Sequence, residues 1–168
     1  MNLVQAELER YNWDSIRVIT GKATEVPGGV QRMLTGYTED QVSGAYWELE
    51  NRVVVQGQLF EAAQYVVPAL IVGLLEDLAR PARHATLELL FQIVSGESHL
   101  SEVERGLPDL GESCRQRARE GLWVIYRELA VGLYAPARSI LECVELDSIR
   151  LADFLERYSR RNKRKKSV

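Results

Sequence analysis

The chain has 168 residues, of which 46% are hydrophobic and 27% are charged, and its formal net charge is −3. This composition is typical of one globular domain and excludes a disordered or membrane-embedded chain. Because no run of 18 apolar residues occurs and no basic region precedes an apolar core at the N-terminus, we expect neither a membrane span nor a secretory signal. We therefore expect a cytoplasmic protein.

Apolar residues recur with helical spacing along most of the chain, and strand-like alternation is almost absent. Thr38 is placed as an N-cap with Gln41 in the capping-box position, and Pro27 suits the first turn of a helix. Pro68 predicts a bend in the helix that contains it. After two short N-terminal helices over 3–11 and 13–20, helices are predicted over 27–34, 38–54, 59–78, 81–94, 112–131, 136–145 and 148–157. This pattern predicts an all-α fold of about eight helices.

Part of the chain has the motif spacing of a tandem repeat with two similar units. Val26-Pro27 is echoed by Val67-Pro68, 41 residues later, and the pair Glu48-Leu49 is echoed by Glu88-Leu89, 40 residues later. A looser third echo begins at Pro136. A period of about 40–47 residues with two helices in each unit is typical of HEAT and armadillo repeats. We therefore expect a short, right-handed α-solenoid of HEAT-like helical pairs.

The segment 159–168 differs in composition from the rest of the chain. It contains six basic residues and no acidic one, which leaves 15 basic and 24 acidic residues in the body, a net charge of −9. We predict a single repeat domain over 1–158 and a disordered, solubilising tail over 159–168. The alternatives for the tail are an electrostatic contact with RNA or anionic lipid and a clasp onto the acidic body.

The residues offer no recognisable catalytic or metal-binding motif. His84 and His99 are the only histidines, and the chain has no paired CxxC, no HExxH, no calcium loop and no GxSxG turn. Cys114 and Cys143 lie in apolar surroundings, which favours free thiols over a disulfide. We expect no cofactor, no metal and no enzymatic activity.

A polar stripe on the second helix of each pair is the main candidate site. Such helices line the concave side of a HEAT-type stack, and solenoids use these surfaces for binding. The candidate partner-binding residues are Glu48, Asn51, Arg52, His84, Glu88, Gln92, Glu142 and Glu145. If the units align, Glu48, Glu88 and Glu142 form an acidic line that would steer a cationic protein. The alternative is a solvated face, or salt bridges to Arg83, Arg115, Arg119 or Arg127 on neighbouring helices.

Aromatic residues at helical spacing could serve either as a ligand-stacking set or as core. We interpret Trp47, Trp123, Tyr46 and Tyr65 as core, because the middle helices of a solenoid are buried on two sides. The same interpretation places Val42, Ala45, Leu49 and Val53 on the buried face of their helix.

Several short motifs resemble a bacterial family of HEAT-like repeat proteins. They are Trp13-Asp14, the Gly21–Pro27 loop, the AYWEL helix from Ala45, the VQGQLFEAA turn from Val55, and Val67-Pro68. The resemblance covers about residues 11 to 131. Proteins of this type occur beside polymorphic toxin genes, where helical repeats act as immunity proteins that occlude a toxin's active site. A second HEAT-like family, DNA glycosylases, has a basic groove, from which this acidic body departs.

The residues and the resemblance together favour a non-enzymatic protein-binding module, and in particular an immunity protein that neutralises a basic bacterial toxin domain. A structural adaptor within a larger complex is the alternative from another class. A third hypothesis is a nucleic-acid-binding factor that uses the basic tail, because the acidic body itself disfavours contact with phosphates.

Overall fold

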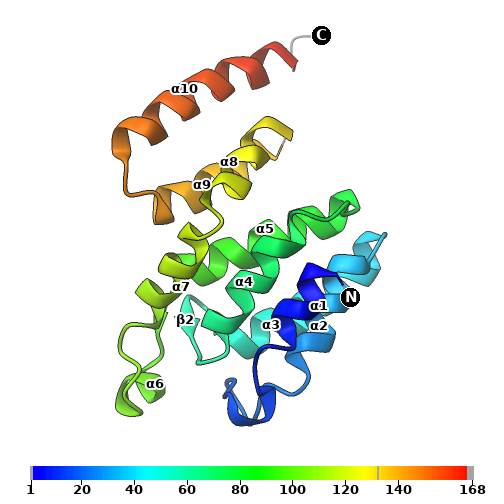
Figure 1. The fold of residues 1–168 in the computed structure, drawn as a ribbon, viewed down its shortest axis with the longest axis vertical. Helices are drawn as coiled ribbons and strands as arrows, with labels where there is room; N and C mark the ends of the chain where they lie inside the picture. The colour runs from blue at the N-terminus through cyan, green and yellow to red at the C-terminus, as the bar shows by residue number, and fades with distance from the viewer. Residues whose placement is uncertain (1, 132, 166–168) are drawn as a thin grey trace.

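The computed structural model describes residues 2–131 and 133–165, with side chains through residue 159, and this part of the chain is mainly helical (Figure 1). This confirms the prediction of an all-α fold. The helices are α1 (Leu3–Leu8), α2 (Val26–Thr35), α3 (Glu39–Val53), α4 (Ala63–Gly73), α5 (Arg80–Val94), α6 (Leu100–Glu104), α7 (Leu110–Arg119), α8 (Leu122–Val131), α9 (Tyr134–Val144) and α10 (Ser148–Lys165).

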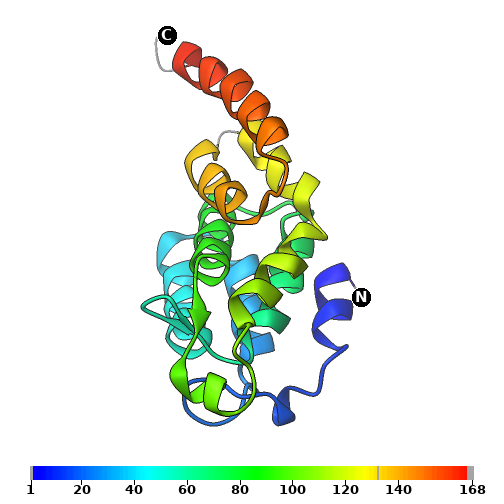
Figure 2. The ribbon, with the colours of Figure 1, turned by 90° about the vertical axis from the view of Figure 1, so that its left-hand side faces the viewer.

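The helices pack in pairs and the pairs pack side by side. Helix α2 packs on α3, α4 on α5, and α8 on α9. Between the pairs, α3 packs on α5 and α5 on α9, while α2 packs on α4 and α4 on α7 (Figure 2). Helix α10 packs on α9 at the far end of the molecule (Figure 1). The second helices therefore follow one another in the order α3, α5, α9, and α10 packs beyond α9.

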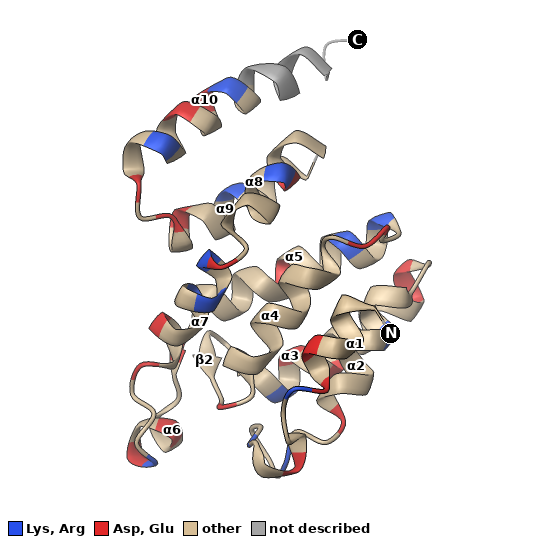
Figure 3. Cartoon of the chain, viewed as in Figure 1, with Lys and Arg blue, Asp and Glu red and all other residues tan. Residues whose placement is uncertain are grey.

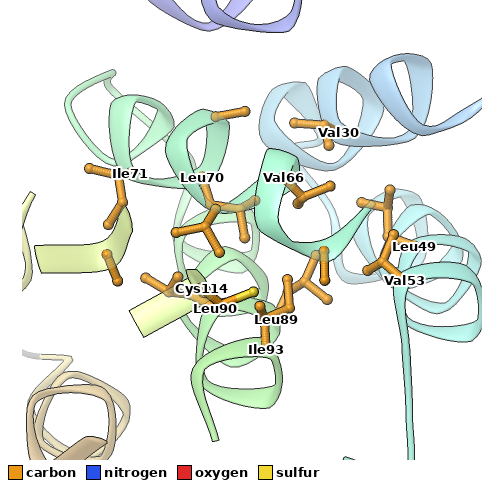
Figure 4. Packing of buried hydrophobic residues seen from close by; sticks show 14 of the residues in the cluster. Val30, Leu49, Val53, Val66, Leu70, Ile71, Leu89, Leu90, Ile93 and Cys114 are labelled. Atoms are coloured by element: carbon orange, nitrogen blue, oxygen red, sulfur yellow. The ribbon is translucent and has the colours of Figure 1, made fainter. Parts of the chain in front are cut away.

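One continuous apolar core joins α1 through α5 and α7 through α9. Leu70, Leu89, Leu90 and Ile93 are fully buried where α4 meets α5, and Cys114 of α7 lies against them (Figure 4). Burying one such side chain contributes about 1.5–3 kcal/mol relative to leaving it exposed. Neither Cys114 nor Cys143 forms a disulfide, as predicted.

The sequence located the start and the buried face of α3 correctly. The side chain of Thr38 accepts a hydrogen bond from the Gln41 N–H at 3.3 Å, and the Gln41 side chain accepts one from the Thr38 N–H at 3.3 Å. This reciprocal pair satisfies two N–H groups that a helix start otherwise leaves open. The predicted core residues of this helix are all buried: Val42, Ala45, Leu49 and Val53.

The aromatic prediction was wrong for both tryptophans. Trp47 is 56% exposed and Trp123 is 60% exposed, whereas Tyr46 and Tyr65 are half-buried. Helix α3 packs against α2, α5 and β1, and Trp47 lies on a side of α3 that is open to solvent.

The helix predicted over 112–131 is two helices, α7 and α8, which meet at Gly121. Gly121 is buried, and a Cβ atom at this position would lie 2.1 Å from Cγ2 of Ile71. The chain approaches α4 so closely here that only glycine fits. The sequence pattern alone does not reveal a break that depends on a neighbouring helix.

The segment 13–20 is not the predicted helix. Only Trp13–Ser15 form a short 3-10 turn, and the chain then runs extended, with the Ala62 N–H donating to the Arg17 carbonyl and the Ile19 N–H to the Arg52 carbonyl. The β-branched residues of this segment disfavour helix, and backbone partners elsewhere satisfy their peptide groups.

Three short strands, which the sequence did not predict, connect the ends of two helical pairs. Strands β1 (Val54–Val55) and β2 (Gln58–Leu59) form a hairpin, and β2 also pairs in parallel with β3 (Glu97–Ser98). Gln56 and Gly57 in the turn both have positive φ, as a two-residue hairpin loop requires.

The predicted boundary between 158 and 159 falls inside α10. The helix continues through Lys165, so the first seven residues of the expected disordered tail are helical. Residues 166–168 lie outside the described part of the chain. A half-buried apolar stripe anchors the helix before this point; it consists of Leu151, Phe154, Leu155 and Tyr158.

Candidate protein-binding surface

The predicted site residues lie on three helices that follow one another in the stack. Glu48, Asn51 and Arg52 lie on α3, His84, Glu88 and Gln92 on α5, and Glu142 on α9, with Glu145 just after it. Because α3 packs on α5 and α5 on α9, the structure places these residues in the predicted order. Burial and ion pairing, however, differ from one of these residues to another.

Two of the predicted glutamates, Glu48 and Glu142, form exposed ion pairs within the chain. Glu48 accepts a hydrogen bond from Arg32 of α2 at 2.5 Å, and Glu142 pairs with Arg138 one turn earlier at 2.8 Å. The predicted acidic line is therefore partly neutralised. The partners are Arg32 and Arg138, and not Arg83, Arg115, Arg119 or Arg127, the arginines named in the alternative interpretation.

Glu145 is not a surface residue, and its assignment to partner binding was wrong. Its side chain is 1% exposed and makes two hydrogen bonds with Arg150, each 2.8 Å long. The Tyr126 hydroxyl donates a third, at 2.6 Å. Hydrogen bonding by Arg150, followed by that of Tyr126, lowers the pKa of Glu145 to about 2. This carboxylate fixes the connection between α9 and α10.

Glu88 has a different environment, which includes a residue that the sequence did not single out. Glu50, on the α5 side of α3, and Glu88 both act electrostatically on Tyr46, and burial together with these two charges raises the pKa of Tyr46 to about 12. Burial also raises the pKa of Glu50. In the described part of the chain, no lysine or arginine forms an ion pair with either carboxylate. Two half-buried glutamates thus lie near each other without a counter-charge.

An exposed aromatic ring borders this pair. The Trp47 ring meets the Tyr46 ring edge-on, with centroids 5.3 Å apart and an angle of 82° between planes. Asn51, one turn after Trp47, is exposed, as is His84, while Gln92 is half-exposed. We call the set Tyr46, Trp47, Glu50, His84, Glu88 and Gln92 the acidic–aromatic face.

This face has the chemistry to receive a cationic side chain. Carboxylates form strong charge-assisted hydrogen bonds with lysine and arginine, and the face of a tryptophan or tyrosine ring attracts the same cations. The sequence signal for Glu50 was its place one turn after Tyr46. The rotation of α3 about its own axis decides which glutamate lies towards α5. Glu48 is on the α2 side and Glu50 on the α5 side.

Elsewhere the buried charges serve the fold. Fully buried Glu102 pairs with Arg17 at 2.9 Å, and fully buried Glu128 pairs with Arg83 at 2.8 Å. Among the described residues, no group of three or more His, Cys, Asp or Glu side chains is arranged to hold a metal ion. Burial raises the pKa of Cys114 to about 12, which keeps this thiol protonated and a poor nucleophile.

No helix in the described part of the chain is long and apolar enough to cross a membrane. Comparisons with known proteins add no relative: no family model, no curated protein and no solved structure matches this chain.

Proposed function

We propose that this chain is a non-enzymatic, HEAT-like α-solenoid that captures a basic protein on the acidic–aromatic face. The observation that carries the proposal is the pair Glu50 and Glu88, two half-buried carboxylates beside exposed Trp47 with no cation of their own chain against them. Most buried or half-buried glutamates elsewhere in the described chain have an arginine partner, as Glu102 and Glu128 do.

The packing order supports the solenoid part of this proposal. We take α3, α5 and α9, which pack in succession, as one layer of second helices, and the two motif echoes fall on α2 with α4 and on α3 with α5. A layer of this kind offers side chains from several helices to one partner.

Binding of a basic partner would lower the free-energy cost of the carboxylates on this face. An unpaired, partly desolvated carboxylate destabilises the free protein, and a partner's lysine or arginine would relieve that cost. The net charge of −9 in the body would also accelerate the encounter with a basic partner. Trp47 would supply the apolar contact that such interfaces place at their centre.

Among basic partners we propose a bacterial toxin domain whose active site the chain occludes, because the motifs resemble those of HEAT-like immunity proteins. The test is genetic. Deletion of this gene in its host should impair growth only while the adjacent upstream gene is intact, and the wild-type gene should restore growth.

Charge-reversal variants in the same growth assay test whether the acidic–aromatic face is responsible for the immunity role. Glu50→Lys/Glu88→Lys should fail to restore growth, whereas Glu104→Lys, a single reversal at an exposed glutamate of α6, should restore it. Both proteins should be present at wild-type levels. Growth that is unaffected by the neighbouring gene would reject the immunity role, and restoration by the double variant would reject the face.

A further inference from the structure

Two places in this molecule combine a tryptophan and a tyrosine ring with glutamate, and they differ in whether an arginine is present. In the C-terminal third, the rings of Trp123 and Tyr126 have centroids 5.4 Å apart, and the Tyr126 hydroxyl donates to Glu145 at 2.6 Å. On the acidic–aromatic face, the rings of Tyr46 and Trp47 have centroids 5.3 Å apart and also lie beside glutamates. The first set therefore shows what the second one lacks.

The C-terminal set contains its own arginine. Arg150 donates two hydrogen bonds to Glu145, each 2.8 Å long, and its guanidinium lies over the Trp123 ring, 5.4 Å from the ring centroid. One guanidinium thus serves a carboxylate and an indole ring together, as its planar shape allows. Acidic and basic residues also lie side by side along the described part of α10, where Arg157 pairs with Asp153 at 2.9 Å (Figure 3).

The set on α3 and α5 has the carboxylates and the ring without the cation. Residues three and four apart lie side by side on a helix, so Glu50 is next to both Trp47 and Tyr46. Glu88 reaches the same place from α5, because it too acts electrostatically on Tyr46. Both carboxylates are half-buried, Trp47 is 56% exposed, and no lysine or arginine of the described chain forms an ion pair with either glutamate.

The two tyrosines show the same contrast in local charge. Burial, followed by the hydrogen bond to Glu145, raises the pKa of Tyr126 to about 12, and Arg150 acts in the opposite direction. Burial, followed by the charges of nearby glutamates, raises the pKa of Tyr46 to about 12 as well. Within the described chain, no positive group opposes this rise at Tyr46.

The position of the two glutamates favours arginine over lysine as the missing group. Glu50 and Glu88 lie on different helices, so a single cation that binds both must donate in more than one direction. A guanidinium has five N–H donors in one plane, whereas an ammonium group is a compact and strongly hydrated charge. This chain contains such a bridge elsewhere, since Arg17 binds Glu61 at 3.1 Å and Glu102 at 2.9 Å.

We propose that the acidic–aromatic face is an arginine-binding site. The guanidinium of an arginine on the basic partner lies over the Trp47 ring and donates hydrogen bonds to both Glu50 and Glu88. This inference rests on the proposed function and names the chemical group that the face recognises. Charge complementarity supports it, because the body that surrounds the face has a net charge of −9 and leaves these two carboxylates without an arginine of their own.

Two end-blocked peptides of equal charge, hexa-arginine and hexa-lysine, test the assignment. Titration calorimetry at about 0.05 M salt measures both affinities where charge attraction is little screened. We expect hexa-arginine to bind the wild-type protein at least about fivefold more tightly, because a guanidinium adds the ring contact and a second hydrogen bond. Glu50→Gln and Glu88→Gln should each remove most of this preference, since either change leaves one end of the bridge without its carboxylate.

A pair of tryptophan variants tests the contribution of the ring. Trp47→Leu should also reduce the preference for hexa-arginine. The matched control is Trp123→Leu, at a 60% exposed ring that already has Arg150 over it, and this variant should keep the full preference. Circular dichroism establishes that each variant is folded.

The possible failures separate this inference from the proposed function. Equal affinity for the two peptides, with both weakened in Glu50→Gln/Glu88→Gln, would overturn the arginine assignment and leave a general cation-binding face. A preference that survives in either single glutamate variant, or in Trp47→Leu, would overturn the bridged and stacked arrangement. Affinities for both peptides that do not change in Glu50→Gln/Glu88→Gln would reject the face itself, and the proposed function with it.

Discussion

The C-terminal third of the molecule and the α3–α5 face treat carboxylates in opposite ways. In the C-terminal third, buried Glu128 and Glu145 are held by arginines, so that each negative charge stabilises a junction between helices. On the α3–α5 face, Glu50 and Glu88 are half-buried and have no such partner in the described chain. Desolvated charge without compensation costs free energy, and proteins retain it mainly at functional sites. The difference separates glutamates that build the fold from those available to a partner.

The largest expected effect on stability comes from removing a buried carboxylate in the C-terminal third of the molecule. Glu128→Ala removes the shared partner of Arg83 and Arg127, and the loss of one member of a buried pair costs about 3–5 kcal/mol of unfolding free energy. Urea denaturation measures this loss. The matched control, Glu142→Ala, breaks an exposed pair with Arg138 and should cost less than about 1 kcal/mol. Equal losses in the two variants would mean that burial does not distinguish these pairs.

The next prediction compares two glycines, one closely packed and one with open space around it, whose replacement should change the unfolding free energy in opposite directions. Gly121→Ala places a Cβ atom 2.1 Å from Ile71 and should lower the unfolding free energy by about 1–3 kcal/mol. Gly44→Ala, at an exposed position of α3 with open space around it, should instead raise that energy by about 0.5–1 kcal/mol through helix propensity. Thermal unfolding of both variants gives the two signs. A stabilised Gly121→Ala protein would show that α7 and α8 do not meet α4 this closely.

Glu145 predicts how stability depends on pH. Its folded pKa of about 2 lies below the usual 4.5, so its contribution is fully present above about pH 4.5 and is lost as the pH falls towards 2. Arg150→Gln should lower the unfolding free energy at pH 7 and have little effect near pH 2, where Glu145 is protonated. The same variant should flatten the dependence of unfolding free energy on pH between about 5 and 2. Parallel pH profiles for wild type and variant would contradict this role.

The smallest effect on stability is expected on the α3–α5 face. Glu50→Gln/Glu88→Gln removes two charges that have no ion pair, so the unfolding free energy should stay within about 0.5 kcal/mol of wild type or rise slightly. Burial raises the pKa of Glu50, which means that its ionised form is the costly one. A loss of more than about 1 kcal/mol in urea denaturation would show that these glutamates stabilise the fold.

The sequence predicted those features of the fold that depend on residues close together in the chain. The capping pair Thr38 and Gln41, the buried stripe of α3, and the pairing of α2 with α3 and α4 with α5 follow from residues a few positions apart. The break at Gly121 and the extended run after Trp13 depend on Ile71 and on the backbone of Arg52 and Ala62, which are distant in the chain. Only the folded arrangement could identify them.

The same limit applies to the candidate surface. Helical periodicity found the layer that contains Glu88, but a rotation of α3 by one or two residues decides whether Glu48 or Glu50 lies towards α5. The partner of Glu145 was likewise invisible in the spacing, because Arg150 becomes a neighbour only when α10 turns back onto α9, whereas the pair of Arg138 with Glu142 lies within one turn of α9.

The most direct test of the central claim is the affinity for the protein encoded by the adjacent upstream gene, measured by titration calorimetry for the wild type and for Glu50→Gln/Glu88→Gln. We predict that the double variant binds at least about tenfold more weakly, about 1.4 kcal/mol, and that its affinity depends less on salt, while its stability is unchanged. Equal affinity and equal salt dependence for the two proteins would contradict the assignment of the acidic–aromatic face.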